Sequence, residues 1–304
     1  MDFTRYLKQR LSKGYLSASS QASPERDKDA DKASLIFLHV PKTAGTTVRA
    51  IIERQYPPSE VYAIYEGSRA VGHHSMADLK ALPEAEKKKI KVYAGHVSYG
   101  LHELIPQPVH YYAMLRDPVD RIISYYHHTM HHNPKFSANK ISLMKFFARK
   151  DPMLHNQQTQ IISGIKAPPG ACSDEMLWTA IDNINDQFCA VGITEMFDES
   201  ILLLRKAMAW DLPEYVHENV SVDRPARDFF SEAEINLIKK NNQLDIMVYS
   251  YVRRQLQKQL DDNSAEFQEE LVQFRRANAE CVGRIKPRMV WRTLKADDGA
   301  NMEK

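Results

Sequence analysis

The feature that most constrains the fold is the apolar run Leu35 to Val40, which passes through a short loop into a segment with helical spacing, Thr47 to Tyr56. A continuous run of this kind is typical of a strand covered on both faces, as in a parallel sheet. More candidate strands follow, separated by segments with helix signals, and this alternation indicates βαβ units and an α/β fold. The further candidate strands are Val61–Tyr65, Ile90–Gly95, Val109–Leu115 and Phe188–Ile193. The further candidate helices are 76–88, 118–131, 141–149, 174–185, 195–209 and a last one from Glu232.

The two ends of the chain differ in composition from the middle. Residues 1–33 combine a Ser-rich stretch with a charged run, which cannot pack a core, so a mobile tail is predicted there. We therefore predict a tail over 1–33, one α/β domain over 34–260, and a helical and basic extension over 261–304. The extension contains a segment, 282–295, with five basic residues. This segment either binds an acidic glycan or a phosphate, or is a solvated tail.

Charge and cysteine content narrow the function classes. The formal net charge is +2, from 41 basic and 39 acidic residues, so the chain lacks the global field that recruits nucleic acid. The three cysteines lie far apart, which fits neither a disulfide framework nor a CxxC site. No apolar run approaches the roughly 20 residues that cross a bilayer, and the N-terminus lacks the apolar part of a signal peptide. We expect a cytoplasmic protein without a nucleic-acid partner or a transmembrane segment.

The loop after the first strand is the strongest candidate for an anion site. It reads P-K-T-A-G-T-T over 41–47 and leads into a helix, so backbone N–H groups, one lysine and three hydroxyls gather at the positive end of the helix dipole. The spacing is not that of a Walker A motif, because the lysine precedes the glycine. The alternative is a threonine-rich loop that only caps the helix. The candidate phosphate-binding residues are Lys42, Thr43, Ala44, Gly45, Thr46 and Thr47.

A second pair of candidate anion ligands follows the strand 109–115. Arg116 comes directly after this strand, where open α/β sheets bind ligands. Ser124 lies eight positions further along, about two helical turns, so both side chains are predicted to reach one phosphate. The alternative for Arg116, and equally for Arg121, is a surface ion pair with Asp117 or Asp120. For Arg116 we favour anion binding, because the first loop needs a partner across the sheet.

The two motifs together resemble those of a known family. H-V-P-K-T-A-G-T-T (39–47) and R-D-P-V-D-R-I-I-S-Y-Y (116–126) resemble the 5′-phosphosulfate loop and the 3′-phosphate motif of sulfotransferases that use 3′-phosphoadenosine 5′-phosphosulfate (PAPS). The resemblance is nearest to the carbohydrate type that includes heparan sulfate 2-O-sulfotransferase, and covers about 34–255. It includes A-G-H-V-S-Y (94–99), N-Q-Q-T-Q-I-I-S-G (156–164) and V-G-I-T-E-M-F-D (191–198). It implies a P-loop-like three-layer α/β fold, with PAPS held by Lys42 to Thr47, Arg116 and Ser124.

By the same resemblance His96 is the candidate catalytic base, together with Lys42 as a catalytic residue. The related enzymes have a second histidine just upstream, in H-G-H, and here Ala94 stands in its place. A hydroxyl that attacks sulfur must lose its proton, and histidine has a pKa near working pH. Lys42 would offset charge on the leaving oxygen, so no metal is expected. The alternative for His96 is a strand-end histidine held in the core, with Glu66 or Glu195 as the base.

Three histidine pairs are less informative. They are His73-His74, His127-His128 and His131-His132. The i, i+4 spacing of His127 and His131 suits one helix face, but a third ligand and an HExxH context are both missing from the pattern. We therefore interpret these histidines as cleft or surface residues and predict no metal site.

The sequence therefore predicts transfer of a sulfuryl group from PAPS to an acceptor hydroxyl on a carbohydrate, by in-line attack with His96 as the base, and a small-molecule acceptor is the alternative. One alternative is an ATP-dependent small-molecule kinase, which the absent Walker A spacing disfavours. The other is a nucleotide-binding protein without catalysis. Acceptor recognition is expected from the loops 66–76, 99–108 and 127–140. A homo-oligomer is left open alongside a monomer.

Overall fold

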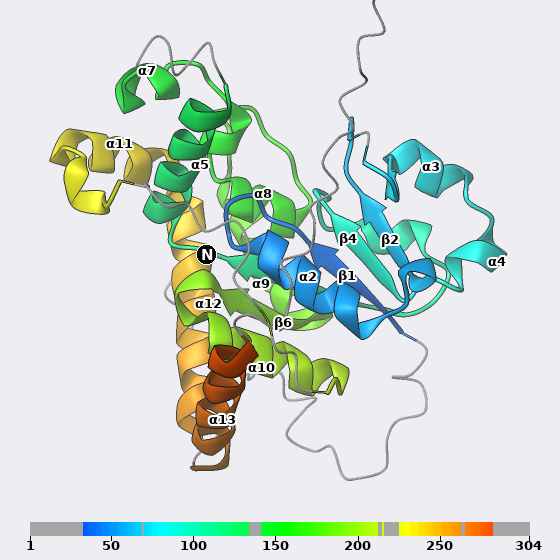
Figure 1. The fold of residues 1–304 in the computed structure, drawn as a ribbon. Coiled ribbons are helices and arrows are strands. Elements are labelled where there is room, and N and C mark those ends of the chain that lie inside the picture. The colour runs from blue at the N-terminus through cyan, green and yellow to red at the C-terminus, as the bar shows by residue number, and fades with distance from the viewer. Residues whose placement is uncertain are drawn as a thin grey trace, which may run out of the picture.

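A computed structural model describes residues 33–68, 70–133, 141–211, 215, 225–262 and 265–281. Within them six parallel strands form one sheet in the order β3-β2-β4-β1-β5-β6 (Figure 1). The strands are β1 (Ser34–Leu38), β2 (Val61–Ile64), β3 (His73–His74), β4 (Val92–Gly95), β5 (Val109–Leu115) and β6 (Phe188–Ile193). The parallel sheet is confirmed. The edge strand β3 is an addition to the predicted strands, because two residues carry no periodic pattern.

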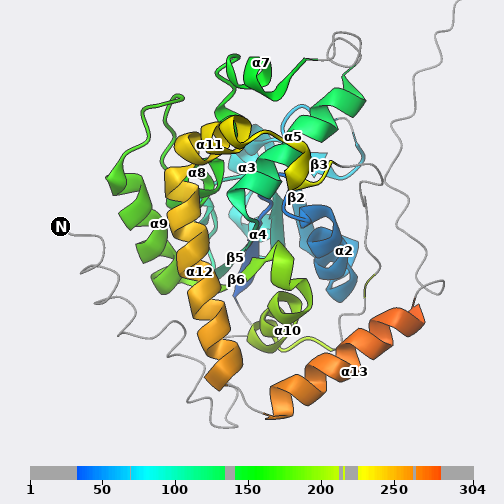
Figure 2. The same ribbon diagram turned by 90° about the vertical axis from the view of Figure 1, so that its left-hand side faces the viewer.

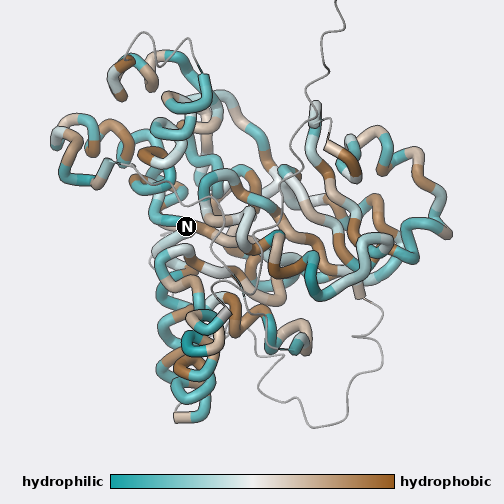
Figure 3. Tube along the Cα trace, viewed as in Figure 1, coloured by the Kyte–Doolittle hydropathy of each residue, from teal (hydrophilic) through white to brown (hydrophobic). Residues whose placement is uncertain are grey.

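Helices cover both faces of this sheet. The helices α2 (Gly45–Gln55) and α10 (Phe197–Met208) lie on one face, and α9 (Asp174–Gln187) and α12 (Gln243–Asp262) lie on the other (Figure 2). All five residues of β1 are buried, as its apolar run predicts for a central strand. Hydrophobic residues concentrate in the strands and on the inner sides of the helices (Figure 3). The predicted three-layer α/β fold is confirmed.

A smaller group of helices lies beyond the carboxyl end of β5. It consists of α5 (Pro118–His132), α7 (Leu143–Phe147) and α11 (Glu232–Asn241), which pack around a second hydrophobic cluster. The buried members of this cluster are Val119, Ile122, Ile123, Leu143, Phe146, Phe147, Leu154, Phe230 and Ile238. Because α5 follows β5 after only two residues, this group of helices stands beside the end of the sheet where a ligand is expected.

Two helical segments differ from the expectation. The helix expected at 76–88 is two helices, α3 (Met76–Ala81) and α4 (Glu84–Lys87), because Pro83 interrupts the helical backbone. The helix α8 (Gln157–Ser163) was not expected. The capping boxes that begin α3 at Ser75 and α11 at Ser231 are confirmed.

The last described helix, α13 (Ala265–Cys281), packs against α10. Its residues Phe267, Leu271 and Phe274 are buried in the main hydrophobic core. The described part of the predicted extension therefore contributes to the core of the domain. The tail 1–32 and the basic segment 282–295 lie outside the described residues. Among the helices that the structure describes, none has the length and apolar composition that spanning a bilayer requires.

Candidate active site

A cavity of about 1100 Å³ opens at the carboxyl ends of β4, β1 and β5, which are neighbours in the sheet. Each of these strands ends beside one predicted motif: β1 beside the loop 41–47, β4 beside His96 and β5 beside Arg116. All of the predicted site residues except Thr43 line the cavity. The lining members are Lys42, Ala44, Gly45, Thr46, Thr47, His96, Arg116 and Ser124. The parallel sheet therefore brings together motifs that are far apart in the sequence.

The loop 41–47 has a backbone suited to an anion. Lys42 and Ala44 adopt left-handed conformations, with φ angles of 70° and 61°, which turn successive N–H groups towards one side. The N-cap of α2 is Ala44, which offers no side-chain acceptor to the first turn of the helix. The hydroxyl of Thr43 is buried and donates to the carbonyl oxygen of Val40 at 2.9 Å. The Thr43 hydroxyl therefore stabilises the loop through Val40, and only the backbone of Thr43 is available to bind a ligand.

Arg116 lies between this loop and the end of β5. Its Nη1 donates to the carbonyl oxygen of Lys42 at 3.2 Å, and its buried Nε has no hydrogen-bond partner among the described residues. Asp117 and Asp120 instead form ion pairs with Arg227, at 2.6 and 3.2 Å. The surface ion-pair alternative for Arg116 is therefore wrong, and its guanidinium keeps donor capacity at the cavity.

Arg121 fits neither alternative considered for it. It is fully buried, and its Nη1 and Nη2 donate to Gln157 Oε1 at 2.8 Å and to the Met153 carbonyl oxygen at 2.7 Å. Burial lowers the pKa of Arg121, while the nearby carboxylate of Asp245 opposes this. Arg121 therefore holds the wall of the cavity in place from inside the protein.

His96 has the hydrogen bonding that a general base needs. Its Nδ1 lies 2.9 Å from the carbonyl oxygen of His39, and since a carbonyl can only accept, Nδ1 carries the proton and Nε2 keeps its lone pair. The His96 side chain is exposed and lines the cavity, so the alternative of a histidine held in the core is wrong. Desolvation lowers the pKa of His96, the hydrogen bond to the His39 carbonyl partly opposes this, and the charge of Arg49 lowers the pKa further, so the ring is neutral at neutral pH.

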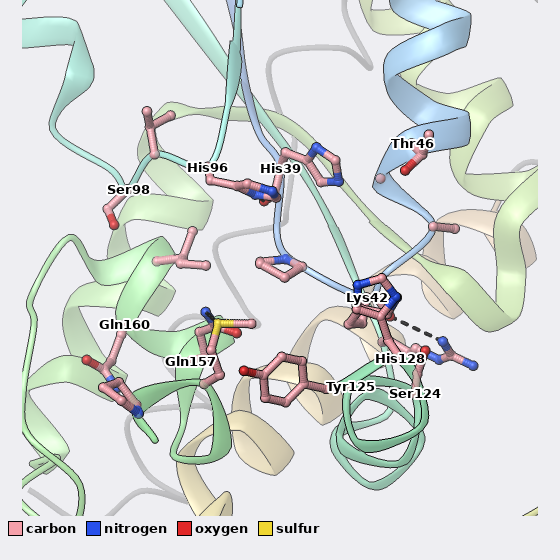
Figure 4. Close-up of a pocket in the computed structure, with 18 of the residues that line it drawn as sticks. His39, Lys42, Thr46, His96, Ser98, Ser124, Tyr125, His128, Gln157 and Gln160 are labelled. Atoms are coloured by element: carbon pink, nitrogen blue, oxygen red, sulfur yellow. Dashed lines mark hydrogen bonds between the residues drawn. The ribbon is translucent and has the colours of Figure 1, made fainter. Parts of the chain in front are cut away.

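His39 is a cavity residue that was not predicted. Its ring centroid is 4.6 Å from that of His96, and its Nδ1 lies 2.7 Å from the Tyr65 hydroxyl (Figure 4). Burial, followed by the charges of His96, Arg49 and Lys42, holds the pKa of His39 well below its usual value. Its position at the end of the first strand could have marked His39 as a site residue. In the sequence, however, it lies within the apolar run 35–40 and was interpreted as part of the strand.

His39 also explains why residue 45 is a glycine. A Cβ atom built on Gly45 would overlap Cδ2 and Nε2 of the His39 ring. A glycine in a phosphate-binding loop lets the backbone approach a phosphate closely. The structure adds a second reason, which is that His39 occupies the space where a side chain would begin.

The other predicted candidates lie in structural roles. Glu195 accepts from the Asp117 backbone N–H at 3.0 Å and from the Tyr249 hydroxyl at 3.2 Å, and burial raises the pKa of Glu195. Glu66 accepts from the backbone N–H of Met76 at 2.7 Å. Neither glutamate lines the cavity. We therefore keep His96 as the candidate base.

Of the predicted histidine pairs, only His128 lines the cavity. Burial, and then the charges of Lys42, His132 and His127, lower the pKa of His128 to about 4, so it is neutral at neutral pH. The rings of His127 and His131 lie 4.3 Å apart, as the i, i+4 spacing predicts. Within the part of the chain that the structure describes, no group of three or more His, Cys, Asp or Glu side chains is placed to hold a metal ion.

Known proteins with similar sequences are carbohydrate sulfotransferases, as the motifs in the cavity predict. A family model described as Galactose-3-O-sulfotransferase matches residues 5–286. The chain belongs to this family. It is 26% identical over 226 residues to galactose-3-O-sulfotransferase 3 of Bos taurus, covering 66% of this chain and 50% of that protein. It is 23% identical over 220 residues to galactose-3-O-sulfotransferase 2 of Mus musculus, covering 66% of this chain and 55% of that protein.

Membership of the galactose-3-O-sulfotransferase family confirms the predicted carbohydrate type. It does not confirm the nearer resemblance to heparan sulfate 2-O-sulfotransferase. The chain spans about half the length of the galactose-3-O-sulfotransferases that it matches.

Proposed function

We propose that this protein transfers the sulfuryl group of PAPS to a hydroxyl group of a carbohydrate. The observation that carries the proposal is that the loop 42–47, Arg116 and His96 line one cavity. Membership of the galactose-3-O-sulfotransferase family supports it. The names of the relatives make the 3-hydroxyl of a galactose residue the first acceptor to test.

The described residues fit PAPS at both of its phosphate ends. The left-handed backbone at Lys42 and Ala44, with the uncapped start of α2, offers N–H groups to the phosphosulfate. Arg116 and Ser124 line the cavity beside it and suit the 3′-phosphate, because a guanidinium group and a hydroxyl group both donate hydrogen bonds to phosphate oxygens. A volume of about 1100 Å³ exceeds what most single small ligands need, which leaves room for a sugar next to a nucleotide.

When bound, PAPS supplies an electrophilic sulfur atom with a phosphate leaving group. His96 Nε2 takes the proton of the acceptor hydroxyl as its oxygen bonds to sulfur. The sulfur–oxygen bond to the phosphate breaks at the same step, and Lys42 stabilises the negative charge that this phosphate oxygen gains. The Nδ1–H bond to the His39 carbonyl holds His96 in the tautomer that this step requires.

The activity is tested by incubating the full chain with sulfur-labelled PAPS and a glycan that ends in galactose. We expect labelled glycan from the unaltered protein and a loss of about 10²–10⁴-fold in kcat for His96→Ala. A matched control is His110→Ala, since His110 is exposed and lies outside the cavity lining. Transfer of phosphate from ATP would overturn the proposal in favour of a kinase. Nucleotide binding without transfer to any of a panel of glycans would overturn it in favour of a non-catalytic protein.

A further inference from the structure

The segment N-Q-Q-T-Q (156–160) has an unassigned role in the proposed reaction, although it lies at the cavity. It forms the start of α8, and the side chains of Gln157 and Gln160 line the cavity. Gln158 between them is only 1% exposed and points into the protein. A fully buried amide must find partners for both its donor and its acceptor.

Gln158 finds these partners on the backbone of a single residue. The backbone N–H of Arg116 donates to Gln158 Oε1 at 2.9 Å, and Gln158 Nε2 donates to the carbonyl oxygen of Arg116 at 2.9 Å. Arg116 is the first residue after β5 ends at Leu115, so the sheet no longer holds its backbone. The amide of Gln158 takes the place of a neighbouring strand, because it forms hydrogen bonds with both the N–H and the C=O of Arg116.

Gln158 is itself fixed by α12. Its backbone N–H donates to Asp245 Oδ2 at 3.2 Å, and the backbone N–H and hydroxyl of Thr159 both donate to Asp245 Oδ1 at 2.8 Å. Asp245 is fully buried, so the start of α8 is anchored in the core. The chain of contacts therefore runs from α12 through α8 to Arg116.

From Arg116 the same chain reaches the phosphate loop. The Arg116 Nη1 donates to the carbonyl oxygen of Lys42 at 3.2 Å. A shift of the Arg116 backbone would move its guanidinium away from the carbonyl oxygen of Lys42. It would also move the guanidinium away from a phosphate bound in the cavity. A binding group must be held within about 0.5 Å of its productive position, and hydrogen bonds from neighbouring buried residues provide this precision.

We propose that Gln158 is a positioning residue that aims Arg116 at the 3′-phosphate of a bound nucleotide. It thereby sets how strongly the protein prefers a nucleotide with a 3′-phosphate over one without. This inference rests on the proposed function, because it takes Arg116 as the ligand of that phosphate.

The test compares adenosine 3′,5′-bisphosphate with adenosine 5′-monophosphate by calorimetric titration of the full chain. In Gln158→Met we expect the preference for the bisphosphate to fall by about tenfold, the range expected when a charge-assisted contact is misplaced, with monophosphate affinity retained. Gln158→Glu is a second variant of similar size that lacks the donor for the Arg116 carbonyl, and the same fall is expected. Ser163→Ala is the matched control on α8, because its hydroxyl bonds to Gln160 and Ile165 instead.

A double-mutant cycle separates positioning from a general loss of structure. In an Arg116→Ala background, Gln158→Met should leave the preference unchanged, because the group that it positions is gone. An equal fall in that background would overturn the inference, as would an unaltered preference in both Gln158 variants. If Arg116→Ala by itself kept the preference, the assignment of Arg116 in the proposed function would fail first.

Discussion

His96 and His39 extend from neighbouring strands of the sheet, and the charge of His96 makes protonation of His39 less favourable. Their ring centroids are 4.6 Å apart, and the charge of His96 contributes to the low pKa of His39. Arg49 adds a further positive charge, since it lies 4.8 Å from the ring centroid of Tyr65, whose hydroxyl contacts His39. Both imidazoles are therefore neutral at neutral pH.

The low pKa of His96 predicts the acid side of the pH profile. A general base works in its neutral form, so kcat/KM falls as the pH drops through its pKa. Since the pKa of His96 lies below the usual 6.5, sulfuryl transfer should persist when the pH falls past 6.5 and decline only in more acidic solution. The groups that face His96 are His39, Tyr65 and Arg49; the hydrogen bond to the His39 carbonyl raises the pKa of His96, but desolvation and the charge of Arg49 outweigh it. A decline in kcat/KM that is centred above pH 6.5 would contradict this assignment.

Gly45→Ala should disturb the site through His39. The added Cβ overlaps the imidazole, and overpacking of this kind costs about 1–3 kcal/mol. We expect a lower melting temperature and weaker binding of adenosine 3′,5′-bisphosphate. In a His39→Ala background the same substitution should cost little, because the ring is no longer there. If Gly45→Ala destabilised both backgrounds equally, the close approach of His39 would not be the reason for the glycine.

At the scale of elements, α8 and α12 are joined by buried polar groups. Asp245 on α12 accepts three hydrogen bonds from Gln158 and Thr159, and its charge is offset by the buried Arg121. Burial raises the pKa of Asp245, and Arg121 opposes this. The arrangement fixes one wall of the cavity against the core.

Asp245→Ala should therefore be strongly destabilising. It leaves the start of α8 without the Asp245 acceptor and removes the carboxylate that most offsets the buried charge of Arg121, and breaking a buried pair of this kind costs about 3–5 kcal/mol. Asp261→Ala is the matched control, since Asp261 is an exposed carboxylate on the same helix. It should change the free energy of unfolding by less than about 0.5 kcal/mol. Chemical denaturation would measure both, and equal effects would contradict the anchoring role of Asp245.

The same elements show what the sequence could predict. The strands β5 and β6 were predicted with their observed bounds, and β1, β2 and β4 within two residues at each end, because burial on both faces leaves a local signal. The site residues next to these strands followed, since parallel strands end at one edge of the sheet. Helix α8 was missed because its start is defined by Asn242 and Asp245, which are 86 residues away in the sequence. Gln158 and His39 were missed for the same reason, since their roles depend on neighbours in space.

For the whole molecule, α13 is a helix of the predicted extension that packs on the main hydrophobic core. Phe274 and Phe267 are almost completely buried in the core that also contains β1 and α10. Arg275 forms ion pairs with Asp198 and Glu199, each at 2.9 Å, at the start of α10. Membership of the galactose-3-O-sulfotransferase family covers this helix as well, because the match extends to residue 286. The cytoplasmic location stays a prediction.

Phe274→Ala should accordingly lower the stability of the whole domain. Removing a fully buried phenylalanine costs about 3–5 kcal/mol. Val272→Ala, on the same helix, removes a side chain that is 65% exposed and should be nearly neutral. The comparison is made by thermal unfolding. A neutral Phe274→Ala would mean that α13 is dispensable for the domain.

The central claim, that this cavity binds the PAPS donor, is tested most directly by calorimetric titration with adenosine 3′,5′-bisphosphate and, separately, with ATP. We predict tighter binding of the bisphosphate, weakened about tenfold or more by Lys42→Ala and by Arg116→Ala, since each removes a charge-assisted contact. Lys89→Ala is the control, because Lys89 is exposed and pairs with Glu86 away from the cavity. Preference for ATP, or bisphosphate binding that neither site variant weakens, would contradict the account.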